Sequence, residues 1–226
     1  MRKIFILKNG NNPCPAAEKW GKGFACAFGQ QTDFAAFEQY KNSEEFAQFL
    51  EQQDASMLII ELCKNSDIQS FLNICRNLRI PYLFIKPNTD FDVKRVALPI
   101  TFLIEDKEKA PFASALGRFC GSKIVICAPK DYGSKARENI NACKTLFNSF
   151  LLSYDEKQCR KGSFGVEKEA VSDAKKESCS LVIVSASREY GLDDIIFGSK
   201  EKRILKTAGV PVLLINPRAD LYALCD

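Results

Sequence analysis

The chain has 226 residues, 46% of them apolar and 27% charged, and carries a formal net charge of +4. This composition is typical of a soluble globular protein, and no apolar run approaches the roughly 20 residues that cross a bilayer. Histidine is absent, which excludes Ser-His-Asp and Cys-His catalysis as well as histidine-ligated metal sites.

The N-terminus contains one short apolar run, Ile4–Leu7, which follows two basic side chains. Such a run is too short for a secretory signal peptide and predicts a first β-strand. We therefore expect a cytoplasmic protein with no membrane partner.

Helical spacing of apolar side chains predicts three helices in the first part of the chain. They lie around Trp20–Phe28, Phe46–Leu50 and Ile68–Leu78. Apolar runs at Leu58–Ile60 and Tyr82–Ile85 predict buried strands between and after these helices, because strands covered on both faces are apolar throughout.

The second part of the chain alternates strictly between strand and helix. Strands are expected at 95–100, 123–128, 153–159, 181–184 and 212–215, and helices near 108–120, 135–152, 163–178 and 200–208. Because parallel strands are joined by crossover connections, this alternation predicts an α/β fold with a mostly parallel sheet. Ser199 is placed to cap the last helix and Gly209 to end it.

Several polar groups in this part are weaker site candidates. Asp106, Glu108 and the pair Asp193-Asp194 precede helices, and we interpret them as solvated carboxylates that favour helix N-termini rather than as metal ligands. Lys161-Gly162-Ser163 is interpreted as a capped turn rather than an anion site. No metal ligand and no catalytic residue is therefore assigned.

An internal repeat sets the domain organisation. Ile80–Pro87 matches Val210–Pro217 residue by residue in pattern, each segment consisting of X-Pro, an apolar strand and a closing proline. The repeat predicts two tandem α/β domains, at residues 1–90 and 91–226. The first copy is shorter, and we expect it to lack one strand–helix segment around residues 30–42.

Residues 95–217 resemble a universal stress protein domain. Val96–Ile100 is similar to that family's first strand, and Gly198-Ser199 with the strand Val212–Ile215 is similar to its C-terminal half. Residues 1–87 resemble the family more weakly, as a shortened tandem copy. The resemblance implies two Rossmann-like units of the adenine-nucleotide-hydrolase type, with a five-stranded C-terminal sheet and a smaller N-terminal sheet.

Nucleotide-binding members of that family hold phosphates on a glycine-rich loop and adenosine with an aspartate after the first strand. Here Ser185 and Arg188 stand at the two earlier glycine positions, and Thr101 stands at the aspartate position. Glu201 places a carboxylate in the helix turn that receives phosphate. The resemblance therefore implies a degenerate nucleotide site, composed of Thr101, Ser185, Arg188, Gly198 and Ser199.

Two functions follow from this resemblance. The first is a non-enzymatic, stress-linked regulatory or interaction protein with an unknown protein partner and no cofactor. Its two halves would pair through Tyr82–Ile85 and Val212–Ile215 as an intramolecular pseudo-dimer, and a further homodimer stays open.

The alternative is an ATP-binding, slowly hydrolysing protein that uses the C-terminal site. A sensor for another small molecule is a third interpretation, whereas mixed-sign surface charge argues against nucleic-acid binding.

The chain contains ten cysteines, and no two of them form a C-x-x-C motif. A zinc or disulfide framework usually contains close pairs, so we expect most of these cysteines to be small buried apolar groups in a reducing compartment. Cys225 near the C-terminus is expected to be an exposed thiol.

Overall fold

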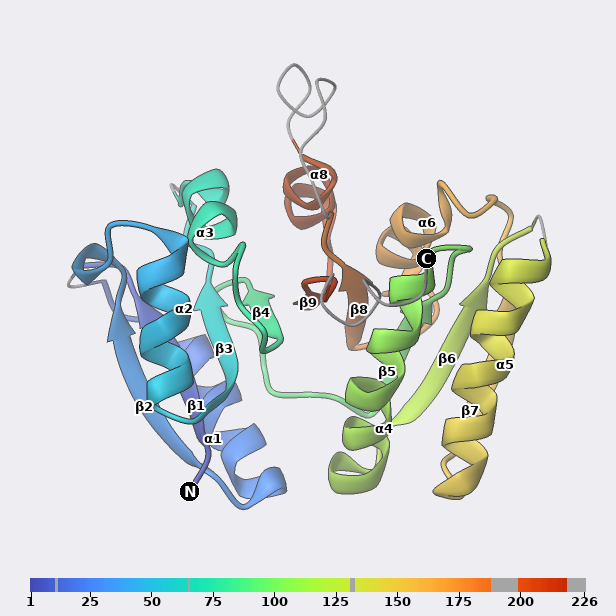
Figure 1. The fold of residues 1–226 in the computed structure, drawn as a ribbon, viewed down its shortest axis with the longest axis horizontal. Coiled ribbons are helices and arrows are strands. Elements are labelled where there is room, and N and C mark those ends of the chain that lie inside the picture. The colour runs from blue at the N-terminus through green and yellow to red at the C-terminus, as the bar shows by residue number, and fades with distance from the viewer. Residues whose placement is uncertain (11, 65, 131–132, 188–198, 219–226) are drawn as a thin grey trace.

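The computed structural model describes residues 1–10, 12–64, 66–130, 133–187 and 199–218 (Figure 1). Nine strands form one sheet in the order β2-β1-β3-β4-β9-β8-β5-β6-β7. The strands are β1 Lys3–Lys8, β2 Gln31–Ala36, β3 Ala55–Glu61, β4 Tyr82–Ile85, β5 Arg95–Pro99, β6 Lys123–Ala128, β7 Tyr154–Gln158, β8 Leu181–Ser185 and β9 Val212–Ile215. The predicted α/β fold with a mostly parallel sheet is confirmed, since every described neighbouring pair except β4 and β9 is parallel.

Helices cover both faces of the sheet. The helices with α-helical geometry are α1 Pro15–Phe28, α2 Ser43–Gln52, α3 Ile68–Ile74, α4 Lys109–Cys120, α5 Ser134–Ser149, α6 Val166–Asp173 and α8 Lys200–Thr207, and two short 3₁₀ turns are η1 Phe37–Gln39 and η2 Ile104–Glu108. The apolar sides of α1, α4 and α5 pack in one core layer, and those of α2, α3, α6 and α8 pack in the other. Neighbouring strand residues such as Phe5 and Ile6 enter opposite layers, as the pleat of a strand requires.

The two parts of the sheet are joined by β4 and β9. Tyr82 pairs with Leu214, Leu83 with Leu213, and Phe84 with Val212, in antiparallel register. The predicted contact between Tyr82–Ile85 and Val212–Ile215 is therefore present. The offset that maps Ile80 onto Val210 relates the Tyr82–Leu214 pair to the Phe84–Val212 pair and the Leu83–Leu213 pair to itself, so the junction has local two-fold character.

Side-chain contacts around the junction follow the same offset. The Asn216 side chain donates to the Leu78 carbonyl oxygen at 3.0 Å. Lys86, which occupies the matching place in the first copy, donates to the Ala208 carbonyl oxygen at 2.6 Å. In each half, the residue after the closing strand therefore contacts the backbone that follows the last helix of the other half.

The strand order is also the same on both sides of the junction, with β4-β3-β1-β2 matching β9-β8-β5-β6. The segment around residues 30–42 was expected to lack a strand, and this is wrong, because residues 31–36 form β2 beside β1. The additional elements of the second part are α5 and β7. Their counterpart in the first part would follow Ala36, where the chain forms only the 3₁₀ turn Phe37–Gln39.

Gly209 does not end α8 in the way its position indicated. The C-cap residue is Ala208, and the positive φ values that mark left-handed glycine caps occur instead at glycines such as Gly29 and Gly121. A Cβ atom on Gly209 would lie 3.1 Å from the Lys175 side chain. The glycine therefore allows a close approach of Lys175 rather than a backbone turn.

No helix in the described ranges is long and apolar enough to cross a membrane.

Candidate functional site

The sequence-predicted site lies at the carboxyl edge of the sheet, where β5 and β8 are neighbours. Thr101 follows β5, Ser185 ends β8, and Ser199 precedes α8. All three side chains are buried. Arg188 and Gly198, the other two residues predicted for the site, lie outside the described residues, as do Asp193 and Asp194.

Asp106 connects the first two of these residues. Its carboxylate accepts the Thr101 backbone N–H, and the Ser185 hydroxyl donates to it at 2.9 Å. Asp106 was interpreted as a solvated helix-start carboxylate, and this is wrong, because it is fully buried. Thr101 thus faces a carboxylate of the protein itself where a ligand contact was expected.

Lys109 neutralises this buried acid. Its ammonium group lies 2.9 Å from the Asp106 carboxylate and donates to the Pro99 carbonyl oxygen at 2.5 Å. Lys109 is also fully buried. Removing one member of such a pair leaves an uncompensated buried charge, so each of the two requires the other.

A second ion pair lies next to the first. Glu167 of α6 accepts the Ser185 backbone N–H at 3.3 Å and pairs with the Lys200 ammonium at 2.7 Å. Lys200 also donates to the Ser185 carbonyl oxygen at 2.8 Å. The same carboxylate lies 3.7 Å from the Lys109 ammonium, so the two ion pairs form one network around the end of β8.

Glu201 occupies the first turn of α8. One of its oxygens accepts both the backbone N–H of Ser187, at 2.6 Å, and its hydroxyl group, at 2.7 Å. Its other oxygen is buried and has no hydrogen-bond partner among the described residues. The turn predicted to receive phosphate therefore holds a buried carboxylate of the chain, and Ser199 caps α8 by accepting the Lys202 N–H at 3.2 Å.

Two groups of this network, Asp106 and Lys200, have shifted pKa values. Burial alone would raise the pKa of Asp106, but the Lys109 charge and hydrogen bonds from Lys109 and Thr101 outweigh it and hold that pKa below its ordinary value. Burial likewise disfavours the Lys200 ammonium, yet the Glu167 carboxylate raises the pKa of Lys200 overall. Asp106 is therefore ionised and Lys200 protonated in the folded protein at neutral pH.

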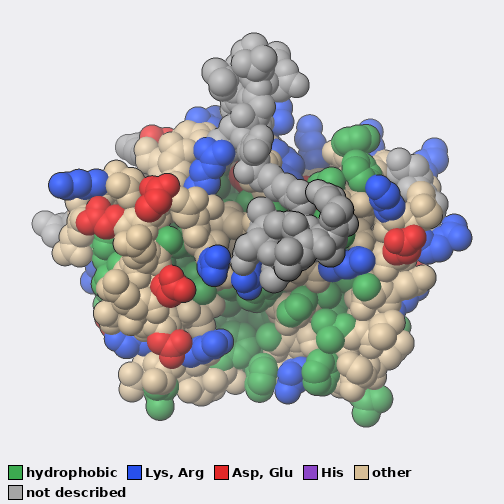
Figure 2. All heavy atoms as spheres, in the orientation of Figure 1, with side chains coloured by type: hydrophobic (Ala, Val, Ile, Leu, Met, Phe, Trp, Pro, Cys, Tyr) green, Lys and Arg blue, Asp and Glu red, His purple; other side chains and the backbone are tan. Residues whose placement is uncertain are grey.

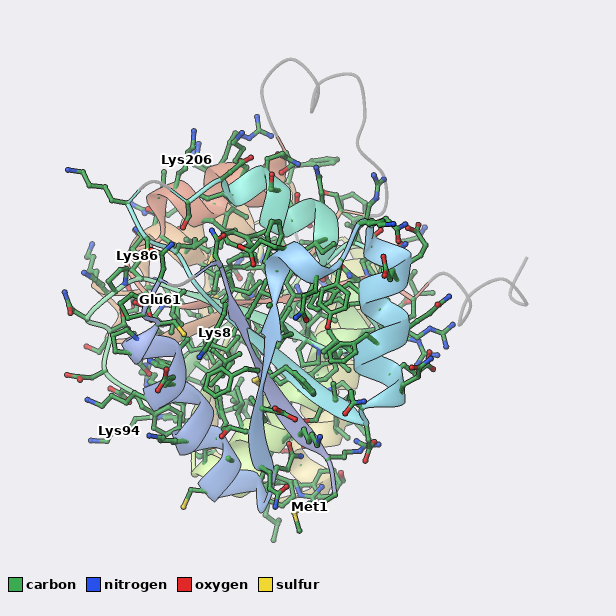
Figure 3. All side chains as sticks on the ribbon, turned by 90° about the vertical axis from the view of Figure 1, so that its left-hand side faces the viewer. Met1, Lys8, Glu61, Lys86, Lys94 and Lys206 are labelled. Carbon is green, nitrogen blue, oxygen red and sulfur yellow. The ribbon has the colours of Figure 1, made fainter. Side chains whose placement is uncertain are left out.

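The same arrangement recurs in the first part of the chain. Glu38 accepts the Gly10 backbone N–H at 2.6 Å, in the loop after β1. Glu61 at the end of β3 accepts the Ala17 N–H at 3.0 Å, and Figure 3 shows Glu61 at the N-terminal end of α1. A carboxylate of the chain thus accepts a backbone N–H at this helix start as well.

The turn at Lys161-Gly162-Ser163 is also filled by the protein. Glu169 of α6 accepts the backbone N–H of Arg160 at 3.0 Å and that of Lys161 at 2.7 Å. Gly162 accepts the backbone N–H groups of Gly165 and Val166, which closes the turn into α6. The structure thus supports the interpretation of this segment as a capped turn.

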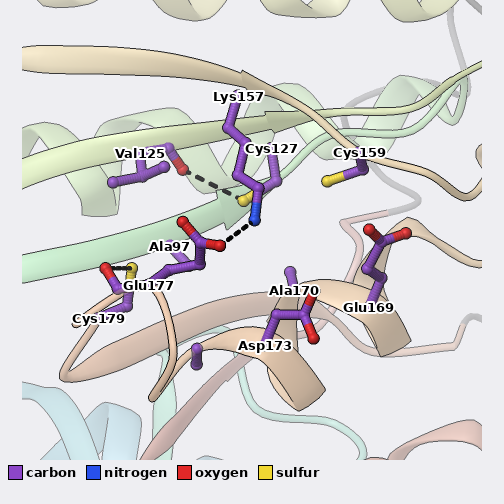
Figure 4. Close-up of a pocket in the computed structure, with 11 residues that line it drawn as sticks. Ala97, Val125, Cys127, Lys157, Cys159, Glu169, Ala170, Asp173, Glu177 and Cys179 are labelled. Carbon is purple, nitrogen blue, oxygen red and sulfur yellow. Dashed lines mark hydrogen bonds and ion pairs between the residues drawn. The ribbon is translucent and has the colours of Figure 1, made fainter.

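A small cavity between β6, β7 and α6 brings three thiols together (Figure 4). Its volume is about 10 Å³, which is room for about one water molecule. The hydrogen bond between Cys127 and Cys159, together with burial, raises the pKa of Cys127, and Lys157 pairs with Glu177 at 2.6 Å. Most of the described cysteines are free and buried, as expected, and Cys225 lies outside the described residues.

Sequence reasoning missed the buried Asp106–Lys109 pair and the role of Glu167. A signal was present, because Lys109 lies on the same helical stripe as the buried residues Ala113 and Leu116. A lysine on an apolar stripe, with an aspartate three residues before it, indicates a buried pair. Glu167 had no comparable signal, since its partners come from β8 and α8.

Comparison with known proteins identifies solved structures that share this fold. No protein-family model matches the chain, and no curated protein matches it by sequence. A universal stress protein from Archaeoglobus fulgidus aligns over 97% of this chain and 88% of its own, with a TM-score of 0.62 and 13% identity. A candidate universal stress protein from Pseudomonas aeruginosa aligns over 95% and 82%, with a TM-score of 0.55 and 11% identity.

A third solved structure, a functionally unknown protein from Pseudomonas aeruginosa, covers 95% of this chain and 82% of its own, with a TM-score of 0.52 and 12% identity. At these identities the similarity shows a shared fold. The chain therefore has the α/β fold of universal stress proteins along nearly its whole length.

Proposed function

We propose that this protein is a universal-stress-protein-like regulatory or interaction protein without catalytic activity, and that its former nucleotide site is closed by its own carboxylates. One observation carries the proposal: Asp106, Glu167 and Glu201 already occupy the backbone N–H groups of Thr101, Ser185 and Ser187.

Electrostatics supports this interpretation. Phosphate sites in α/β proteins use free backbone N–H groups at helix starts, where the helix dipole favours negative charge. Here a phosphate would meet the Glu201 carboxylate, one oxygen of which is buried and unpartnered among the described residues. Bringing a second anion beside it is unfavourable in a site of low dielectric constant.

The junction supports a tandem origin within the same proposal. The repeated strand order, the antiparallel pairing of Tyr82–Ile85 with Val212–Ile215 and the matched contacts of Asn216 and Lys86 agree with two copies of one unit. In this proposal residues 1–90 and 91–226 form an intramolecular pseudo-dimer. The remaining surface is then available for a protein partner.

Titration calorimetry with Mg-ATP tests the proposal against the ATP-binding alternative. We expect no binding heat at millimolar nucleotide. A dissociation constant below about 100 μM, equivalent to about −5.5 kcal/mol, would favour the alternative instead. The control for the alternative is Gly198→Asp, which would abolish binding if the Gly198-Ser199 segment held the phosphates.

A second arm asks whether carboxylates are what closes the site. The variant Glu201→Ser restores a small hydroxyl residue and frees the Ser187 N–H, and we expect it to gain weak affinity for inorganic tripolyphosphate. The exposed Glu51→Ser on α2 is the matched control. Equal affinity of both variants and the native chain would contradict the role assigned to Glu201.

A further inference from the structure

A hollow of about 510 Å³ lies between α6 and α8, on the outer side of the helix layer. It is lined by Phe164, Glu167, Lys168, Lys200, Arg203, Ile204, Lys206 and Thr207. Figure 2 shows basic side chains at the upper rim, between the positions that α8 and α6 occupy in Figure 1. We call this hollow the α6–α8 groove. The groove adjoins the network at the end of β8 and shares Glu167 and Lys200 with it.

The groove has an excess of positive charge. Four basic side chains face one carboxylate, and that carboxylate, Glu167, is already paired with Lys200 at 2.7 Å. Lys168, Arg203 and Lys206 are exposed, and none of them forms an ion pair within the described part of the chain. Figure 3 shows Lys206 at the rim of the molecule. Three basic side chains therefore remain available to an acidic partner.

The groove also has an apolar component. Phe164 is 95% exposed, the largest exposed fraction among the exposed large apolar side chains of the described residues. Its ring makes an edge contact with Phe102, at a centroid distance of 5.2 Å. Ile204 is buried at the floor. Exposed aromatic side chains and arginine are enriched at protein interfaces.

We propose that the α6–α8 groove binds an acidic segment of a partner protein, with a large apolar side chain of that segment packed against Phe164 and Ile204. The inference rests on the proposed function as an interaction protein and gives the chemistry of its partner. Carboxylates of the segment would pair with Lys168, Arg203 and Lys206.

A protein segment fits this groove better than a small phosphate ligand. The basic side chains project from two separate helices rather than converging on one cluster of backbone N–H groups. The N–H groups of the nearby turns are occupied by Glu167, Glu169 and Glu201. A single exposed phenylalanine also differs from the succession of aromatic side chains on which single-stranded nucleic acids stack.

Nuclear magnetic resonance titration of the ¹⁵N-labelled full chain tests the proposal. The probe is a short peptide in which glutamates flank one phenylalanine, added at low salt. We expect amide shifts concentrated in residues 164–168 and 200–207, and a dissociation constant that increases with ionic strength. Absence of shifts in these residues at millimolar peptide would overturn the proposal.

Variants separate the charge from the apolar contribution. The double substitution Arg203→Glu and Lys206→Glu should weaken peptide binding by about tenfold or more, and Phe164→Ser should weaken it without removing its salt dependence. The control Lys22→Glu reverses an exposed helix lysine on α1 and should leave binding unchanged. Equal weakening by the control would overturn the site.

Two further probes distinguish other occupants. A peptide with serine in place of phenylalanine should bind more weakly, and equal binding would contradict the apolar contact. The second probe is oligouridylate. If it shifts the amides of the same residues more strongly than the peptide does, the groove binds nucleic acid rather than a protein segment, and the proposal is overturned. Neither result depends on whether the protein binds Mg-ATP. A failure of the peptide to bind the groove is therefore distinguishable from a failure of the proposed function.

Discussion

At the scale of single residues, carboxylates accept hydrogen bonds from backbone N–H groups along the carboxyl edge of the sheet. Asp106 is the most constrained of them, because it is fully buried, ion-paired to Lys109 and hydrogen-bonded to Thr101 and Ser185. Hydrogen bonds to a charged group contribute about 1.5–3 kcal/mol each. Such an acid organises the loop after β5.

Asp106→Asn is expected to destabilise the protein by about 3–5 kcal/mol, because it leaves the buried Lys109 ammonium without its counter-charge. Urea unfolding at neutral pH measures the change. The control is Asp155→Asn, which disrupts a solvent-exposed pair with Lys123 and should change stability by less than about 1 kcal/mol. Similar losses in the two variants would contradict the buried pair.

Acid should weaken the same interaction. The pKa of Asp106 in the folded protein lies below its ordinary value, so the stabilisation is complete above the unfolded-state pKa of about 3.9 and is lost as pH falls below it. We expect the free energy of unfolding to fall more steeply below about pH 4 in the native chain than in Asp106→Asn. Parallel curves would show that Asp106 does not carry this dependence.

Prediction from sequence at this scale was partial. Thr101, Ser185 and Ser199 were correctly placed at one edge of the sheet, because strand ends and caps are local features. Asp106, the partner of the first two, was interpreted wrongly although its spacing to Lys109 is local, because its contacts with Thr101 and Ser185 depend on the fold. The Glu167–Lys200 pair, by contrast, joins residues 33 positions apart, and such long-range pairing leaves little trace in local sequence.

At the scale of elements, the junction between β4 and β9 holds the sheet together. Asn216 is its main side-chain contact: it accepts the Tyr82 hydroxyl at 2.6 Å and donates to the Cys75, Arg76 and Leu78 carbonyl oxygens. These carbonyl groups follow α3 in the other half. The contact links the closing strand of one half to a helix end of the other.

Asn216→Ala should lower the free energy of unfolding by about 1–3 kcal/mol, because it leaves several partly buried polar groups without partners. Differential scanning calorimetry measures the loss and the number of transitions. We expect the native chain to unfold in one transition, since the sheet is continuous across the junction. Two separate transitions in the native chain would show that the halves fold independently.

Elements with one strong apolar stripe or run were predicted well, including β6 at residues 123–128 and β9 at 212–215. The exception is β2, Gln31–Ala36, an edge strand whose residues are mostly exposed or half-buried. An edge strand pairs on one side and needs little apolar sequence. Its absence from the prediction follows from that physical difference.

At the scale of the whole molecule, the composition leaves few side chains that change charge near neutral pH. The chain has no histidine, the side chain that ordinarily changes charge between about pH 5 and 8. We expect the free energy of unfolding to be nearly constant between about pH 6 and 7, because the folded and unfolded states bind nearly equal numbers of protons there. Above about pH 7.5 it should fall, because thiols of the unfolded chain lose protons that buried cysteines such as Cys75 and Cys143 keep. Chemical denaturation in matched buffers checks this. A clear slope between about pH 6 and 7 would contradict this expectation.

The contact between the two halves was predicted from the sequence, but most of the carboxylate contacts at the edge of the sheet were not. The repeated X-Pro-strand-Pro segments indicated that the closing strands pair, and the structure contains that pairing as one continuous nine-stranded sheet. Of the carboxylates at this edge, Glu201 was placed correctly from the sequence, whereas Glu38, Glu61 and Glu169 could not be, since each reaches N–H groups elsewhere in the chain.

The central claim is that the protein's own acids occupy the N–H groups that a nucleotide would use. Nuclear magnetic resonance of the Thr101, Ser185 and Ser187 amides tests it most directly. The account predicts three amides that are protected from hydrogen exchange and that do not shift when Mg-ATP is added at millimolar concentration. Saturable shifts of these three amides with Mg-ATP would contradict it.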